Sequence, residues 1–434
     1  MEQRASRSEP RETTSTATLN SRQTSLNVIK LYKNFRLVWL GNFVAQGGQW
    51  LQFLTIGWLV LKLTDGNALL TGTVIGIRML PVLFIGPWAG VLADRMDRRK
   101  LVMVSQLVMA TSAILFALLV LVTDLDSDPV SGPLRWWHPF VYMVIAGIAH
   151  SFIQPVRQAM IANTVPRHAL ASALALNGMV YPSTRIIAPA IGGLLIAAVG
   201  FKWNFFLEAM AYVGIVLLLI PVKLPYREDS QRTNVSALAS MKEGIRFVLQ
   251  ERRIVHLILL GIFPNFIWQP LVFMLPVFTT EVLGRGAGAG GILAASIGAG
   301  GVVAAVLIAG VGFVFRKGMV AFIGLVSGCL LVLLFALSTW YLVSIAILVA
   351  MGFSQYIFRV ANSTLVQTIV PDEFRGRVMS IYMLDHGFTP VATLLISLAV
   401  HLWNPSGAFA VIGAFSLVLS VVLAITLSQV RRLE

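Results

Sequence analysis

The chain consists of long apolar stretches that short charged loops interrupt. The stretch from Trp39 to Leu61 holds 23 residues without a charge. That length is enough to cross a bilayer as a helix and too long for the apolar part of a removable signal peptide. The dense charged loop at residues 94–100 separates the second apolar stretch from the third. Because charge is costly inside a bilayer, this alternation predicts an all-α membrane protein.

Composition sets the number of spans. Hydrophobic residues make up 57% of the 434 residues and charged residues 12%, about half the charged share of a soluble domain. At ~20–25 residues per span with short loops, roughly twelve helices fit. We place them at residues 37–61, 68–92, 100–123, 138–162, 171–199, 203–222, 254–281, 287–314, 318–338, 341–364, 376–401 and 406–430.

The distribution of basic residues predicts the orientation. With the amino terminus in the cytoplasm, 26 of the 33 lysines and arginines fall on the cytoplasmic side and four on the outer side. Short cytoplasmic loops carry such an excess, so both termini are expected to be cytoplasmic, in a plasma membrane. The net charge of +14 does not indicate a nucleic-acid partner, because no basic helix with interleaved aromatic residues is present.

The charged loop also resembles a family signature. Gly90, Leu92, Ala93, Asp94, Arg95, Arg98 and Arg99 fill the pattern that joins helices two and three of the major facilitator superfamily. Asp97 departs from the usual Gly, and the ending Asp-Arg-Arg resembles a bacterial exporter branch with siderophore and macrolide efflux proteins. The resemblance implies two pseudo-symmetric six-helix bundles. It also implies a conformational latch, in which Asp94 faces the start of helix eleven and Gly90, Arg95, Arg98 and Arg99 complete the motif.

An internal repeat supports two halves. A Val-Pro pair follows helix four at Val165 and helix ten at Val370, 205 residues apart. Parallel repeats of this kind are typical of transporters that alternate access around a midplane site. We expect a disordered tail at 1–26, bundles at 27–222 and 253–434, and a cytoplasmic linker with an amphipathic helix at 223–252.

Polar stripes inside four spans predict a substrate cavity, because lipid cannot satisfy such groups. In the implied fold, helices one, four, seven and ten line the central path. Hydrogen bonding between helices is the alternative, and Arg157 and Arg359 could instead extend to the membrane surface. The cavity candidates are Asn42, Gln46, Gln49, His150, Gln154, Arg157, Asn265, Gln269, Gln355, Arg359 and Asn362.

Four further charges lie deep in the spans. Arg78 lies about 15 Å into helix two and Asp385 about 14 Å into helix eleven at ~1.5 Å per residue, and we expect them to approach each other, directly or through His386. The proton-coupling candidates are Asp385, Arg78 and Glu208, with a static ion pair or a structural role as the alternatives. Arg185 could attract an anionic group of the substrate or pack against helix eight.

Helix five holds a partial match to the antiporter motif of drug exporters, carried by Pro189, Gly192 and Gly193. The Gly-rich stretch 284–301 lacks a following Lys-Ser/Thr, so it indicates helix packing and not a nucleotide site. The single Cys329 forms no disulfide framework. No arrangement of nucleophile, base and orienting acid is evident, so we expect no enzyme, no cofactor and no metal.

The sequence therefore predicts a secondary active transporter. Its expected function is proton-coupled export of an amphiphilic small molecule, a drug or a siderophore, by alternating access. An importer or facilitator of a metabolite or lipid is the alternative, and a non-transporting membrane scaffold is a third possibility. The expected partners are the substrate, the lipid bilayer and protons, and the protein is expected to act as a monomer.

Overall fold

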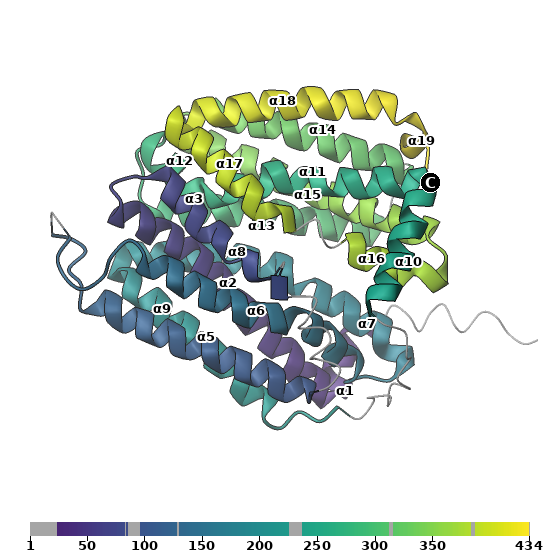
Figure 1. The fold of residues 1–434 in the computed structure, drawn as a ribbon, viewed down its shortest axis with the longest axis horizontal. Helices are drawn as coiled ribbons and strands as arrows, with labels where there is room; N and C mark the ends of the chain where they lie inside the picture. The colour runs from purple at the N-terminus through teal and green to yellow at the C-terminus, as the bar shows by residue number, and fades with distance from the viewer. Residues whose placement is uncertain are drawn as a thin grey trace, which may run out of the picture.

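The protein is all-helical in its described part. We analysed a computed structural model, which describes residues 24–82, 84–85, 96–127, 130–224, 237–311, 316–382 and 387–433. Figure 1 shows two groups of helices lying against each other, one built from the helices before α10 and the other from those after it. The first group is α1 (Thr24–Leu31), α2 (Lys33–Leu63), α3 (Ala68–Ile77), α5 (Arg98–Leu121), α6 (His138–Ala162), α7 (Arg167–Gly178), α8 (Val180–Val199) and α9 (Phe201–Leu219).

The linker segment contains α10 (Ala237–Gln250). The second group follows it and packs around its own apolar core, which includes Trp268, Phe278, Phe335 and Phe409. Its helices are α11 (Arg252–Phe273), α12 (Leu275–Glu281), α13 (Ala287–Val311), α14 (Lys317–Ala336), α15 (Tyr341–Ile369), α16 (Asp372–Tyr382), α17 (Thr389–Leu402), α18 (Pro405–Thr426) and α19 (Ser428–Arg431).

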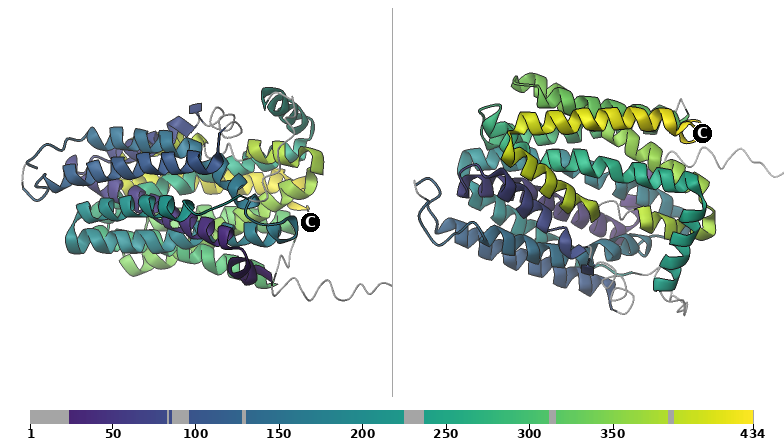
Figure 2. Two further views of the ribbon diagram at one scale, coloured as in Figure 1. Left: turned by 90° about the horizontal axis from the view of Figure 1, so that it is seen from below. Right: turned by 45° about the horizontal axis from the view of Figure 1, so that its top comes forward.

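Eight helical segments of the described chain are long and apolar enough to cross a membrane. Three shorter apolar helices, Ala68–Val82, His138–Ile153 and Thr389–Leu402, accompany them. The expectation of an all-α membrane protein is confirmed. Seen along other directions, the long helices run roughly parallel to one another, as helices that cross a bilayer together do (Figure 2).

Several of the predicted spans are interrupted. The second span breaks after Ile77, whose carbonyl would need an N–H from Pro81, and proline has none. The fifth span breaks at Met179 for the same reason, since Pro182 cannot donate to Gly178. The seventh divides at Met274, just before Pro276. These three breaks interrupt the helices predicted over 68–92, 171–199 and 254–281. The eleventh span, predicted over 376–401, contains α16 and α17, and residues 383–386 between them lie outside the described part.

Glycines bring the two halves into close contact. A Cβ at Gly193 of α8 would lie 2.6 Å from the carbonyl oxygen of Ala287 on α13, and one at Gly298 of α13 would lie 2.6 Å from Cγ1 of Ile186. At the second contact, a Cβ at Gly72 of α3 would lie 2.4 Å from Cβ of Ser397 on α17. Backbones approach this closely only where side chains are small. These positions explain the Gly-rich stretch 284–301.

The two ends of the helices differ in how the halves meet. We call the end with α10 and α16 the linker end, and the end with Lys62 and residues 122–137 the loop end. At the linker end, α7 packs mainly on α1, α6 and α8, and α16 packs on α10 and α15, each within its own half or the linker. A salt bridge of 2.9 Å joins Glu243 of α10 to Arg377 of α16. The glycine contacts between the halves lie from mid-helix toward the loop end.

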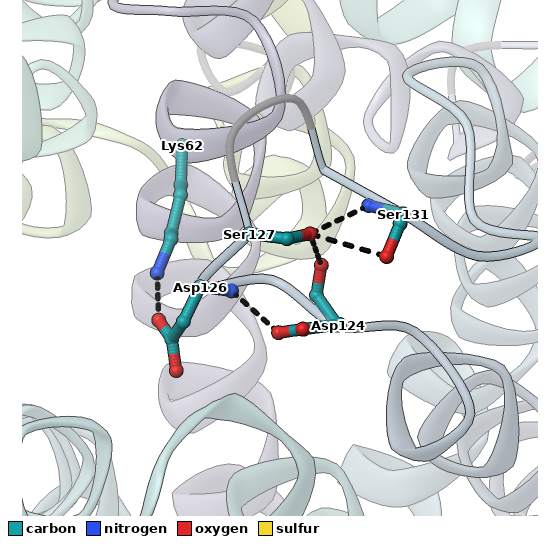
Figure 3. Close-up of polar contacts among 5 residues, drawn as sticks. All are labelled: Lys62, Asp124, Asp126, Ser127 and Ser131. Atoms are coloured by element: carbon teal, nitrogen blue, oxygen red, sulfur yellow. Dashed lines mark hydrogen bonds and ion pairs between the residues drawn. The ribbon is translucent and has the colours of Figure 1, made fainter.

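At the loop end, Lys62 fastens α2 to the segment between α5 and α6 (Figure 3). Its Nζ lies 2.5 Å from Oδ1 of Asp126. The segment is itself ordered by the Asp126 amide, which donates to Asp124 Oδ1 at 3.0 Å, and by the Ser131 amide, which donates to Ser127 Oγ at 2.9 Å. This contact ties the loop end of the first span to the third and fourth.

We predict that Gly193→Ala destabilises the protein by ~1–3 kcal/mol, because a methyl group there meets the backbone of α13 and forces the halves apart. Thermal unfolding of the purified protein in detergent measures the effect. Gly47→Ala is the matched control, since a Cβ at Gly47 of α2 meets nothing within 4 Å. Equal stability of the two variants would contradict the close α8–α13 contact.

We predict a small pH effect from the Lys62 contact. The hydrogen bond and charge of Lys62 hold the pKa of Asp126 below its ordinary value. A lowered pKa gives stability that is present above the unfolded pKa and lost as pH falls through the folded one. Lys62→Gln should therefore flatten the acid limb of a plot of thermal stability against pH, slightly, because the pair is exposed. Lys202→Gln removes a charge at the same end and should leave the acid limb unchanged. An acid limb that flattens in Lys202→Gln and stays unchanged in Lys62→Gln would contradict the pairing of Lys62 with Asp126.

Candidate transport path

The polar stripe of α2 faces the neighbouring helices of the first half. Asn42 donates through Nδ2 to Oδ1 of Asn177 on α7 at 3.2 Å. One turn later, Gln46 donates to Oε1 of Gln49 at 3.0 Å and accepts a hydrogen bond of 3.3 Å from Nη2 of Arg157 on α6. The i, i+4, i+7 spacing thus places the stripe on one face, where it bonds to α6 and α7.

Arg185 of α8 connects the two halves. Its Nη2 donates to Oε1 of Gln355 on α15 at 3.5 Å, and its guanidinium carbon lies 5.5 Å from the centre of the Trp50 ring on α2. Neither Nε of Arg185 nor Nε2 of Gln355 has a hydrogen-bond partner among the described residues. Arg185 also interacts electrostatically with Arg359 of α15. We call Gln46, Gln49, Arg157, Arg185 and Gln355 the polar cluster.

A small space lies beside Arg185. Its volume is about 20 Å³, which is room for about one water molecule. Aromatic contacts support its wall: Trp50 lies edge to face against Tyr181 with 5.5 Å between ring centres, and Phe53 and Phe273 are tilted against each other at 5.4 Å. The lining residues are Trp50, Phe53, Leu54, Arg185, Pro189, Val272, Phe273, Pro276 and Ala294.

The helix-five motif forms the boundary of this region toward the loop end. Pro189 lines the small space, and Gly193 packs on α13 as described above. The Gly192 carbonyl accepts a hydrogen bond of 2.9 Å from Nδ2 of Asn204 on α9, which also donates to Thr55 of α2. The motif therefore joins three helices of the first half to the second half.

The polar residues of the second half have other surroundings. Asn362, with no exposed surface, donates to the Leu257 carbonyl at 3.0 Å and to Tyr382 at 3.1 Å. Asn265 donates to the Gly261 carbonyl at 3.5 Å. The Asn362 bonds hold helices of the second half together, whereas the Asn265 bond lies within α11. Gln269 is half-buried and Arg359 exposed, whereas the side chain of Gln154 lies outside the described part.

The expected pair of Arg78 and Asp385 is not described, because Asp385 and His386 fall outside the described residues. Arg78 is fully buried at the break of the second span. It interacts electrostatically with Glu208 of α9 and with His150 of α6. Among the described side chains, Glu208 carries the one buried carboxyl group.

The latch is described only in part. Gly90, Asp94 and Arg95 lie outside the described residues. Asp97 caps α5 by accepting a hydrogen bond of 2.9 Å from the Arg99 amide. Arg98 begins that helix, and Nη1 of Arg99 donates to the carbonyls of Ile220 and Val222, at 3.1 and 2.9 Å. The basic part of the motif thus joins the start of the third span to the end of the sixth.

Sequence reasoning missed several buried polar residues. Gln52, Tyr142 and Tyr212 surround Glu208, each with at most 3% of its surface exposed. Gln52 stands one turn after Gln49 and extends the stripe of α2, a signal that was available. The tyrosines gave no such signal, because an isolated tyrosine in an apolar span is also expected at a membrane interface.

Comparison with known protein families decides the class. The model of the transmembrane secretion effector family matches residues 30–434. The chain belongs to this family of the major facilitator superfamily. It is 27% identical over 405 residues to the staphyloferrin A transporter of Staphylococcus aureus, covering 89% of this chain and 92% of the relative. It is 25% identical over 417 residues to the enterobactin exporter EntS of Escherichia coli, covering 94% and 95%.

Solved structures confirm the major facilitator fold. A bacterial homologue of the human lysosomal transporter Spinster, in an inward-facing and occupied conformation, superposes with a TM-score of 0.67 at 14% identity, covering 94% of this chain and 96% of that one. A peptide transporter of the POT family reaches 0.71 at 13% identity, covering 92% and 95%. The protein is therefore a multi-pass membrane transporter related to siderophore transporters and exporters, and not an enzyme.

Proposed function

We propose that the protein exports anionic, amphiphilic small molecules of the siderophore type and that a proton gradient drives this export. The observation that carries the proposal is the polar cluster, where Arg157 bonds to Gln46 and Arg185 bonds to Gln355 and lies over the Trp50 ring. Arg359 interacts electrostatically with Arg185. The relationship to a staphyloferrin A transporter and an enterobactin exporter supports the same substrate class.

The charge of the cluster favours an anion. Arg185 and Arg359 carry like charges and interact with each other, and a negative group between them would relieve that repulsion. At an effective dielectric of ~20, two unit charges ~4 Å apart interact by ~4 kcal/mol. A cationic drug would instead meet arginines, so cation export is disfavoured. The Trp50, Tyr181 and Phe53 rings supply an apolar surface for the rest of the molecule.

The contacts between the halves support the proposed direction. These contacts lie from mid-helix toward the loop end, while α7 and α16 pack within their own half or on the linker. Since the basic loops predict that the linker end is cytoplasmic, the path in this state would open toward the cytoplasm. An exporter takes up its substrate in that state.

Proton coupling is the energy source that the sequence allows, because the chain holds no nucleotide-binding motif. Asp385, Arg78 and Glu208 are the candidates for the coupling site. Alternating access would use the Asp94 latch and the glycine contacts to hold opposite ends closed in turn.

We predict that cells lacking their own efflux pumps accumulate less catecholate and carboxylate siderophore when they express this protein. A protonophore and Asp94→Asn should each abolish the difference. A cationic dye serves as the control and should accumulate equally with and without the protein. Lower accumulation of the dye alone would replace anion export with cation export, and increased siderophore uptake would reverse the direction.

We predict that Arg185→Gln raises the half-saturating siderophore concentration about 10–100-fold, because a hydrogen bond to a charged group contributes ~1.5–3 kcal/mol. Arg185→Lys should restore part of the loss by returning the charge. Arg285→Gln is the matched control, since Arg285 also lies over an aromatic ring, 4.8 Å from the centre of Tyr341, at the loop end. If Arg185→Gln and Arg285→Gln change the half-saturating siderophore concentration equally, Arg185 does not belong to the substrate site.

A further inference from the structure

A chain of buried hydrogen bonds inside the first half ends on a carboxyl group. Gln52 of α2 donates through Nε2 to the Tyr142 hydroxyl at 2.8 Å, and that hydroxyl donates to Oε1 of Glu208 on α9 at 2.6 Å. Gln52 is 1% exposed and Glu208 has no exposed surface. Phe116 of α5 stacks on the Tyr142 ring, 4.6 Å between centres, and closes that side.

The hydrogen-bond network is incomplete at Glu208. The Tyr212 hydroxyl also interacts with the Glu208 carboxyl group, but neither this hydroxyl nor Oε2 of Glu208 makes a hydrogen bond of good geometry among the described residues. Arg78 lies near both and interacts with them electrostatically. Yet none of its three guanidinium nitrogens donates a hydrogen bond within the described structure. Its described contact is the Phe53 ring, 4.7 Å from the guanidinium carbon.

This arrangement differs from a static ion pair. A buried acid and base that serve only the fold bond to each other, because an unpaired buried charge costs several kcal/mol. Here the two groups are near each other and unbonded, which fits a neutral, protonated Glu208. The guanidinium is held at a break of the second span, so a small movement of α3 would change its distance to the carboxyl group.

Helix α6 lies between this pair and the polar cluster. His150 of α6 is 6% exposed and interacts electrostatically with both Arg78 and Arg157. At ~1.5 Å per residue, Tyr142 and His150 are about 12 Å apart along α6, and His150 and Arg157 about 10 Å. Arg157 belongs to the polar cluster. One helix therefore carries contacts to Glu208, to Arg78 and to the proposed substrate site.

We propose that Glu208 takes up and releases the coupled proton and that Arg78 controls its release. This inference rests on the proposed function. When Arg78 stands away, a hydronium ion gives a proton to Oε2 of the carboxylate: one O–H bond of hydronium breaks, leaving water, and one O–H bond of the carboxylic acid forms. When α3 moves the guanidinium against the carboxyl group, that O–H bond breaks and the proton passes to a water molecule, which becomes hydronium. The titratable and charged groups facing Glu208 are Arg78, Tyr142 and Tyr212, with His150 beyond Arg78.

The first test needs no substrate. Infrared difference spectra of the full-length protein in lipid nanodiscs, recorded between acid and alkaline pH, report the C=O stretch of each protonated carboxyl group. The wild type should show a band from a buried carboxylic acid. Glu208→Gln should remove it, and the matched control Glu281→Gln, on an exposed carboxyl at the loop end, should keep it. Tyr142→Phe should retain the band at a shifted frequency, because the hydrogen bond to Oε1 is lost.

A band unchanged in Glu208→Gln would overturn the proposal, and loss of the band in Asp385→Asn instead would move the role to Asp385.

The second test uses proteoliposomes loaded with catecholate siderophore. Glu208→Gln should keep siderophore exchange and lose accumulation driven by a pH gradient; retention of gradient-driven accumulation would also overturn it. If the wild type transports no siderophore but shows the Glu208 band, the proposed substrate fails and the proton site stands.

Discussion

Polar groups inside a bilayer have no water to bind, so each must find a partner within the protein. This constraint organises the first half of the molecule. Gln46, Gln49 and Arg157 satisfy one another, and Asn204 joins three helices through two hydrogen bonds. Groups that break the rule stand out for this reason. Arg78 and one oxygen of Glu208 lack bonds within the described chain, and an unsatisfied buried charge marks function more often than packing does.

The contacts between the halves obey a second constraint. Helices in lipid gain little from apolar burial against each other, so close association needs small residues. Gly193, Gly298 and Gly72 provide it on both sides of the central path. When two helices touch through their backbones, the whole contact either forms or is lost, because a closely packed surface does not deform gradually. That property suits a transporter whose halves must close at one end while they open at the other.

The fold could be predicted from the sequence because its determinants are periodic: apolar length, basic loops and the motif around Asp94. The interruptions at Ile77 and Met179 were also encoded, by Pro81 and Pro182, but long apolar runs concealed them. The partners of the buried polar residues depend on tertiary packing, which the sequence pattern does not show. Asn362 has the same spacing as the cavity stripes, yet it bonds to Leu257 and Tyr382 within its half. The bond between Tyr142 and Glu208 joins residues 66 positions apart, which no local pattern reveals.

Alternating access driven by protonation is the central claim, and paired distance measurements test it most directly. In a Cys329→Ser background, spin labels would be placed at exposed positions on the two halves. His168 and Thr368 report on the linker end, and Val199 and Leu337 on the loop end. Electron–electron resonance distances in nanodiscs would be compared at acid and alkaline pH. The account predicts that the linker-end distance shortens as the loop-end distance lengthens. Two distances that stay constant at every pH, with and without siderophore, would contradict it.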